Sequence, residues 1–123
     1  MEFGENSAIY VQIADQFCEN ILLAKLKPGD RIPSVREMAV TLEVNPNTVL
    51  RTYNYLQDMG IIFNKRGIGY YVSDEGFQRT RDLRRQDFIN NEIPGFFKAM
   101  SLLNLSLQDI EVYFREFQNS HGK

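Results

Sequence analysis

The chain of 123 residues contains one cysteine (Cys18), one histidine (His121) and no tryptophan. A single cysteine excludes an intramolecular disulfide and suits a reducing compartment. One cysteine and one histidine cannot assemble a structural zinc site, and they leave little for a Ser-His-Asp or Cys-His catalytic group. We therefore predict a protein that is not an enzyme and that needs no metal and no cofactor.

Long apolar runs and a leader sequence are also missing. The sequence has no stretch of about 18 apolar residues, so we expect no segment to span a membrane. The start, MEFGENSAIY, lacks the basic and apolar regions of a secretory signal. Together with the scarcity of cysteine, this predicts a cytoplasmic protein.

Excess positive charge is absent too, because the net charge is −2, whereas proteins that bind nucleic acid are usually basic. The distribution of charge argues the other way. Residues 31–73 carry five Lys and Arg against three Asp and Glu. We therefore expect a local basic surface on an acidic protein.

Apolar residues at helical spacing predict a first helix over residues 9–24, which the segment KPGDRIP (27–33) ends. Arg31 and Ile32 fit a very short strand. The segment SVRE (34–37) has the pattern of a capping box at the start of a short second helix. The inward side of that helix is predicted to carry Val35, Met38, Ala39 and Leu42.

The segment VNPNTVLRTY (44–53) places a proline near the start of a third helix. The missing N–H of Pro46 costs nothing at the first helical position, so Asn45 is predicted to be the N-cap. This helix should run to about Met59, with Gly60 just beyond its end. Its buried side is predicted to hold Val49, Tyr53, Leu56 and Met59, and its opposite side Asn47, Arg51, Asn54 and Asp58.

Residues 61–72 (IIFNKRGIGYYV) predict two short strands around a turn that contains Gly67 and Gly69. The order helix, short helix, turn, helix, hairpin is that of a winged helix-turn-helix, whose last helix enters a DNA major groove. The predicted fold is mainly α with a small β-hairpin. We assign residues 1–73 to a winged helix-turn-helix DNA-binding domain and residues 74–123 to a C-terminal helical dimerisation tail.

The outer face of the third helix has the chemistry of DNA recognition. Arginine offers two donors to guanine and asparagine pairs with adenine, while the amides of Asn47 and Thr48 lie at the positive helix end, which suits a phosphate. The wing and the start of the second helix add cations and hydroxyls. The alternatives are a solvated helix face for the third helix, ion pairs with nearby acids for Arg36, and a charged hairpin tip that keeps a sheet edge soluble for Lys65 and Arg66. The predicted DNA-binding residues are Ser34, Arg36, Asn45, Asn47, Thr48, Arg51, Asn54, Lys65, Arg66 and Gly67.

The residues after Val72 predict a long helix, and its apolar positions keep one phase across Pro94. This favours a kinked helix over a break, with a turn at 91–95 as the alternative. Ser106 and Asp109 then have the positions of a capping pair for a final helix. Two helices cannot bury the many aromatic residues of this tail between themselves, so we predict a symmetric homodimer, with a tail folded back on its own domain as the alternative. The predicted dimerisation residues are Phe88, Ile89, Ile93, Phe96, Phe97, Met100, Leu103, Ile110, Phe114 and Phe117.

Residues 26–72, from LKPGD through PSVREMA, VNPNTV and the GIG of the wing, resemble the GntR family of bacterial transcription regulators. The VNPNTV segment and the short tail are similar to its YtrA-type subfamily. The resemblance implies DNA contacts by Arg36, the front of the third helix and the wing, and repression of transporter genes. Many members carry arginine at the positions of Pro46 and Leu50, so contacts made by those arginines are not carried over.

The sequence thus predicts a sequence-specific regulator, most simply a repressor, that binds double-stranded DNA as a homodimer on a palindromic operator. One rival is a protein-interaction module that uses the winged helix as a docking surface. Another is a small-molecule sensor with an effector cleft between tail helices, lined by Phe96, Met100 and Phe114. The sequence leaves the effector, the operator and the sign of regulation open.

Overall fold

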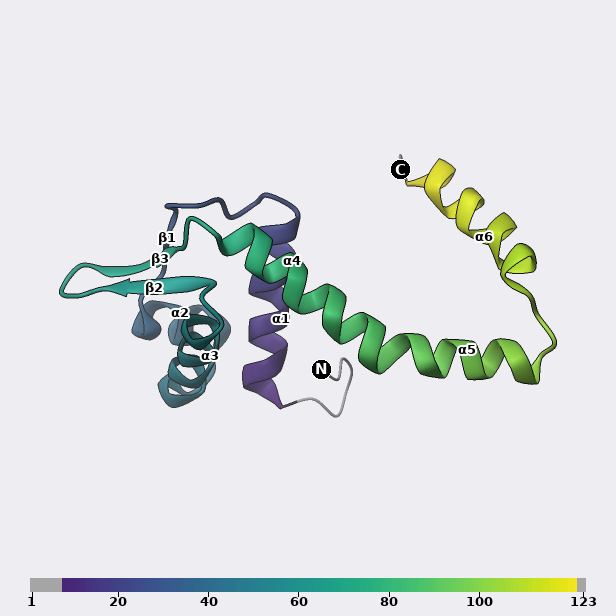
Figure 1. Cartoon of the computed structure of the whole chain (residues 1–123). Helices are drawn as coiled ribbons and strands as arrows, with labels where there is room; N and C mark the ends of the chain where they lie inside the picture. The colour runs from purple at the N-terminus through teal and green to yellow at the C-terminus, as the bar shows by residue number, and fades with distance from the viewer. Residues whose placement is uncertain (1–7, 122–123) are drawn as a thin grey trace. The chain divides into compact units, whose positions relative to one another are not determined.

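The computed structural model describes residues 8–121 (Figure 1), and the chain divides into two compact units after Gln86. Residues 1–7 and 122–123 of the two predicted domains lie outside the described residues. The predicted boundary at residue 73 stays a prediction. The division after Gln86 lies beyond residue 73 because α4 (Gly76–Asp87), except for its last residue, belongs to the first unit. Thr80 of this helix is fully buried, and Arg84 lies 3.8 Å from the carboxylate of Asp15.

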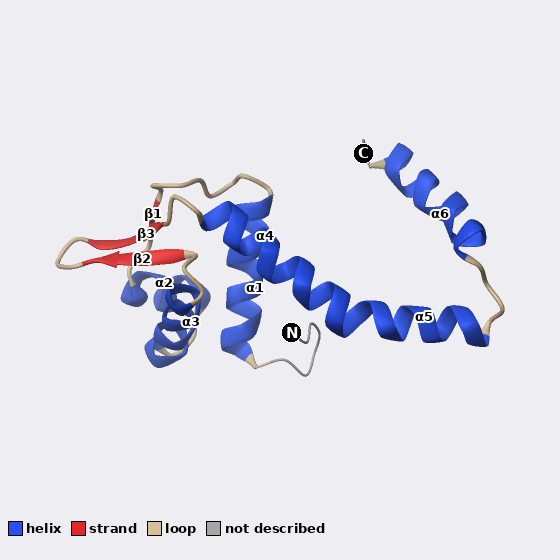
Figure 2. Cartoon of the chain, in the orientation of Figure 1, coloured by secondary structure: helices blue, strands red, loops and turns tan. Residues whose placement is uncertain are grey.

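The first unit contains three further helices, which confirm the predicted helical order. They are α1 (Ile9–Leu22), α2 (Val35–Leu42) and α3 (Pro46–Asp58). Figure 2 shows them beside a small sheet, in a chain that is otherwise mostly helical. The predicted caps of α2 and α3 are both present, so short-range signals placed these two helices correctly.

The sheet has three antiparallel strands in the order β1-β3-β2. They are β1 (Arg31–Ile32), β2 (Ile62–Lys65) and β3 (Gly69–Val72). The predicted hairpin and the predicted short strand are therefore confirmed. Ile62 pairs with Val72 in the hairpin, and β1 extends the sheet by pairing Arg31 with Tyr71. This third strand ties the loop before α2 to the wing.

One apolar core joins α1, α2, α3 and the sheet. The rings of Phe17 and Tyr53 meet edge to face, with their centroids 5.6 Å apart, and Tyr70 meets Tyr53 at 4.8 Å. Cys18 is fully buried in this core, and burial raises the pKa of its thiol. The core therefore packs against the apolar side of α3, as the helical spacing of its apolar residues predicts.

Three details of the predicted helices are wrong. Leu42 and Met59 were expected to be inward, but they are 42% and 36% exposed. Both lie where a helix ends, and Glu43 (φ 56°) and Gly60 (φ 76°) turn the chain there into the left-handed conformation. The first helix ends at Leu22, because Ala24 adopts a left-handed φ of 62°. In each case the helical spacing of apolar residues predicted a buried helix position beyond the last turn that packs on the core.

The second unit begins at Asp87. A π-helical turn, η1 (Phe88–Glu92), leads directly into α5 (Ile93–Leu102). The predicted continuity of the helix across Pro94 is therefore confirmed and the alternative break at 91–95 is not found. A proline removes one ladder hydrogen bond and clashes with the preceding turn, and the wider π-turn ends at Glu92, two residues before Pro94. The last helix, α6 (Leu107–Ser120), begins with the predicted capping pair, in which Ser106 and Asp109 exchange hydrogen bonds of 3.1 and 2.9 Å.

Candidate nucleic-acid interface

The start of α2 is set by a complete capping box. The hydroxyl oxygen of Ser34 accepts a hydrogen bond of 3.1 Å from the backbone N–H of Glu37, and the Glu37 carboxylate accepts one of 2.8 Å from the backbone N–H of Ser34. The backbone N–H of Ser34, and after it the Ser34 hydroxyl, lower the pKa of the Glu37 carboxyl group by hydrogen bonding to it. Arg36 lies between the two capping residues and is exposed, so its guanidinium is available to a partner.

The start of α3 is set by its N-cap, Asn45, as predicted. The side-chain oxygen of Asn45 accepts a hydrogen bond of 2.7 Å from the backbone N–H of Asn47, and its carbonyl accepts one of 2.9 Å from the N–H of Thr48. Both amides therefore have partners within the cap, and a phosphate contact from them stays a prediction.

The outer face of α3 has the predicted polar character. Asn47, Arg51 and Asn54 are exposed, and Thr48 beside them is half-buried. On the opposite side Val49, Tyr53 and Leu56 are fully buried. The helix thus presents amide and guanidinium groups outward from a rigid apolar base, which is the arrangement that base recognition in a major groove needs.

Two residues outside the predicted DNA-binding set adjoin this face. The Arg51 guanidinium carbon lies 4.0 Å from the centre of the Tyr10 ring. The hydroxyl of Thr52, fully buried, donates a hydrogen bond of 2.9 Å to the backbone carbonyl of Tyr10. The signal for Thr52 was its helical spacing with Val49 and Leu56, which places a lone polar residue on the buried side. No local signal pairs Tyr10 with Arg51.

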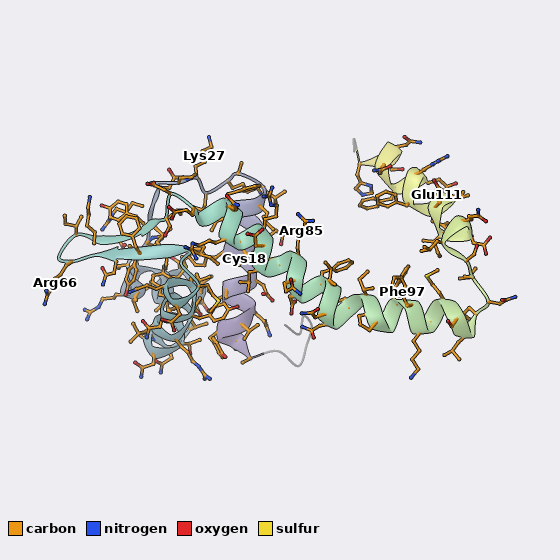
Figure 3. All side chains as sticks on the ribbon, in the orientation of Figure 1. Cys18, Lys27, Arg66, Arg85, Phe97 and Glu111 are labelled. Atoms are coloured by element: carbon orange, nitrogen blue, oxygen red, sulfur yellow. The ribbon has the colours of Figure 1, made fainter. Side chains whose placement is uncertain are left out.

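The wing places further cations at the end of the hairpin. Lys65, Arg66 and Gly67 are all exposed, and Figure 3 shows Arg66 at the far tip of the hairpin. Gly67 adopts a φ of 77°, and the turn closes with a hydrogen bond of 2.8 Å from the N–H of Ile68 to the carbonyl of Lys65. This conformation favours glycine, so the sequence of the turn matches its shape.

Within residues 8–121, no three His, Cys, Asp or Glu side chains are placed to hold a metal ion. In the same part of the chain, no helix has both the length and the apolar character needed to cross a membrane. The groups that the predicted interface offers to a partner are the guanidinium, ammonium, amide and hydroxyl groups of α2, α3 and the wing.

Residues 9–72 match the family described as bacterial regulatory proteins, gntR family. This chain belongs to the GntR family. It is 36% identical over 109 residues to the HTH-type transcriptional regulator YhcF of Bacillus subtilis (strain 168), covering 89% of this chain and 88% of that protein. It is 46% identical over 69 residues to the HTH-type transcriptional repressor YtrA of the same organism, covering 56% and 53%.

The solved structures agree with the sequence matches. A transcriptional regulator of the GntR family from Bacteroides thetaiotaomicron superposes with a TM-score of 0.78 at 43% identity, covering 93% of this chain and 99% of that one. The predicted family and the winged helix-turn-helix fold are confirmed. The chain is a GntR-family transcriptional regulator with a DNA-binding helix-turn-helix, and its family and relatives are regulators of transcription, not enzymes.

Proposed function

We propose that this GntR-family regulator is a repressor that binds a palindromic operator as a homodimer. The observation that carries the proposal is the exposed row of Asn47, Arg51 and Asn54 on a helix whose opposite side is fully buried. Arg36 at the start of α2 and the cations of the wing would add phosphate contacts on either side of this row. Together they would place the protein in one register on a duplex.

The homodimer is supported by the apolar side chains that the tail leaves exposed. Phe96, Phe97, Phe114 and Phe117 are each about half exposed, and Leu103 more so. Figure 3 shows Phe97 projecting from α5. Large exposed apolar patches mark interaction sites, and a second copy would cover the same patch on both subunits. Met100 is only 8% exposed, so we expect it to contribute less to the contact than the other predicted residues.

Repression is the sign of regulation that the relatives favour. YtrA of Bacillus subtilis carries the name of a repressor, and its similarity to this chain covers 56% of it. A dimer with two reading heads binds two half-sites about one helical turn apart. Such a complex on a promoter would exclude RNA polymerase.

The test begins with selection of bound sequences from a random duplex pool, followed by titration of the best duplex by fluorescence anisotropy. We expect an inverted repeat. Arg51→Ala should weaken binding by about 5- to 150-fold, the range for removal of one bidentate interaction with a base, and Arg36→Ala should weaken it further. Arg115→Ala is the matched control, because it removes the same charge from α6, where Arg115 pairs with Glu111 at 2.7 Å.

Two outcomes would contradict the proposal. Equal affinity for selected and random duplexes would favour the protein-interaction rival, since sequence-independent binding comes from phosphate contacts alone. Unchanged affinity of the Arg36→Ala, Arg51→Ala double variant would show that the interface lies elsewhere. A thermal shift by a small molecule that also changes operator affinity would add the sensor function to the repressor.

A further inference from the structure

Arg51 is held by a contact that its helix does not provide. Its guanidinium carbon lies 4.0 Å from the centre of the Tyr10 ring, which comes from the start of α1. This is the shortest of the three cation–π contacts found among the described residues; the others join Lys65 to Tyr71 at 5.5 Å and Arg81 to Phe77 at 5.7 Å. Attraction between a cation and a ring face is effective within about 6 Å.

The backbone that carries the Tyr10 ring is bonded to α3. The backbone carbonyl of Tyr10 accepts a hydrogen bond of 2.9 Å from the hydroxyl of Thr52, and Thr52 directly follows Arg51 on α3. Thr52 is fully buried and the Tyr10 side chain is half-buried. The segment that carries the ring and the segment that carries the arginine are therefore joined at the same point. The contact between Arg51 and Tyr10 belongs to a fixed junction of α1 with α3.

The contact with Tyr10 leaves the Arg51 side chain exposed. The guanidinium carbon lies over the Tyr10 ring, and arginine has five N–H donors around a planar group. Donors that do not face the ring can form a two-donor contact to a guanine or a phosphate.

We propose that Tyr10 is a positioning residue for DNA binding, which holds the Arg51 guanidinium in the orientation that meets the duplex. The inference rests on the proposed contact of Arg51 with DNA. A free arginine loses rotamer freedom when it binds. Contact with the Tyr10 ring already restricts the Arg51 side chain in the free protein, so that less rotamer freedom is lost when DNA binds. Tyr10 acts through Arg51, and no contact of Tyr10 itself with a base is needed.

The test is a double-mutant cycle on the selected duplex, measured by anisotropy with full-length protein. Tyr10→Leu should weaken binding roughly 2- to 5-fold, because part of the entropy cost of immobilising a long side chain is then incurred on binding, and Tyr10→Phe should retain wild-type affinity because it keeps the ring. In an Arg51→Ala background, Tyr10→Leu should cause no further loss. Tyr10→Leu should also reduce the same base preference that Arg51→Ala reduces. Phe77→Leu is the matched control, because it removes the ring beneath Arg81 on α4.

The possible results separate the two proposals. If Arg51→Ala leaves affinity unchanged, the proposed DNA contact of Arg51 fails and the role of Tyr10 fails with it. If Arg51→Ala weakens binding but Tyr10→Leu has no effect, or has the same effect in both backgrounds, only the role of Tyr10 is overturned. NMR relaxation of the Arg51 side-chain N–H in the free wild-type protein gives a test without any variant. An order parameter for Arg51 that is higher than the one for Arg66 supports the proposal. Equally low order parameters for the two side chains overturn it.

Discussion

The hydroxyl of Tyr53 donates a hydrogen bond of 2.7 Å to the backbone carbonyl oxygen of Pro33. Tyr53 lies on the buried side of α3, and Pro33 precedes Ser34, the N-cap of α2. Burial raises the pKa of the Tyr53 hydroxyl, and the nearby Tyr70 and Glu37 raise it further. The group therefore stays protonated and remains a donor. One bond thus connects α3, the helix proposed to read bases, with the loop just before α2, whose start is proposed to contact phosphates.

Removal of this donor should destabilise the protein without opening a cavity. We expect Tyr53→Phe to lower the free energy of unfolding by about 1 kcal/mol, because the ring stays in place and one hydrogen bond is removed. Urea unfolding followed by far-ultraviolet circular dichroism measures the change. Tyr113→Phe is the control, since it removes the same atom from a side chain that is 65% exposed. Equal losses in the two variants would show that the bond to Pro33 contributes nothing specific.

The wing should contribute to DNA affinity through attraction to phosphates more than through preference for a base sequence. Lys65→Ala with Arg66→Ala should reduce the slope of log affinity against log salt by about 1 for each phosphate that the wing no longer neutralises. Affinities for the selected duplex and for a random duplex should fall by similar factors. Anisotropy titrations between about 50 and 200 mM salt measure the slope. Replacement of Lys98 and Arg115 by alanine removes equal charge from the tail, and a similar change of slope there would contradict a wing contact.

The tail helix α6 allows a direct test of the dimer. Phe114→Asp should convert the dimer to a monomer, because it buries a charge in the proposed interface. Val112→Asp is the matched control. Val112 is 56% exposed, Phe114 is 57% exposed, and the two lie on nearly opposite sides of the helix. Sedimentation velocity reports the mass of each variant. A monomeric wild-type protein, or equal disruption by both variants, would refute the predicted face.

The capping box of α2 predicts a dependence of stability on pH. Hydrogen bonds from the backbone and hydroxyl of Ser34 hold the pKa of Glu37 below its ordinary value of 4.5. The stabilisation is therefore present above that value and is lost as the pH falls through the lower pKa of the folded state. Glu37→Gln keeps an acceptor but cannot titrate as Glu37 does.

The difference in thermal midpoint between wild type and Glu37→Gln should accordingly favour wild type near neutral pH and diminish below the ordinary carboxyl pKa of 4.5. Differential scanning fluorimetry across this range measures it. Glu19→Gln on α1 serves as the control for general effects of charge removal from an exposed side chain. A difference that stays constant with pH would argue against the hydrogen bonds from Ser34 to the Glu37 carboxylate.

Much of the fold could be predicted from the sequence because its signals act over a few residues. Ser34 with Glu37, Asn45 with Pro46, and Ser106 with Asp109 each mark a helix start through side-chain and backbone groups within one turn. The spacing of Val49, Tyr53 and Leu56 identified the buried side of α3, and hence its outer face. The two glycines of the wing identified the hairpin in the same way.

The tertiary structure decided what depends on groups far apart in the chain. The predicted first helix includes Tyr10, but only the packing of α1 on α3 brings its ring beneath Arg51. The same holds for the bond from Tyr53 to Pro33 and for the exposure of Leu42 and Met59 at helix ends. A sequence pattern records which side of a helix is apolar. It does not record where the neighbouring element stops covering that side, because this depends on the contact between two whole segments and not on either one.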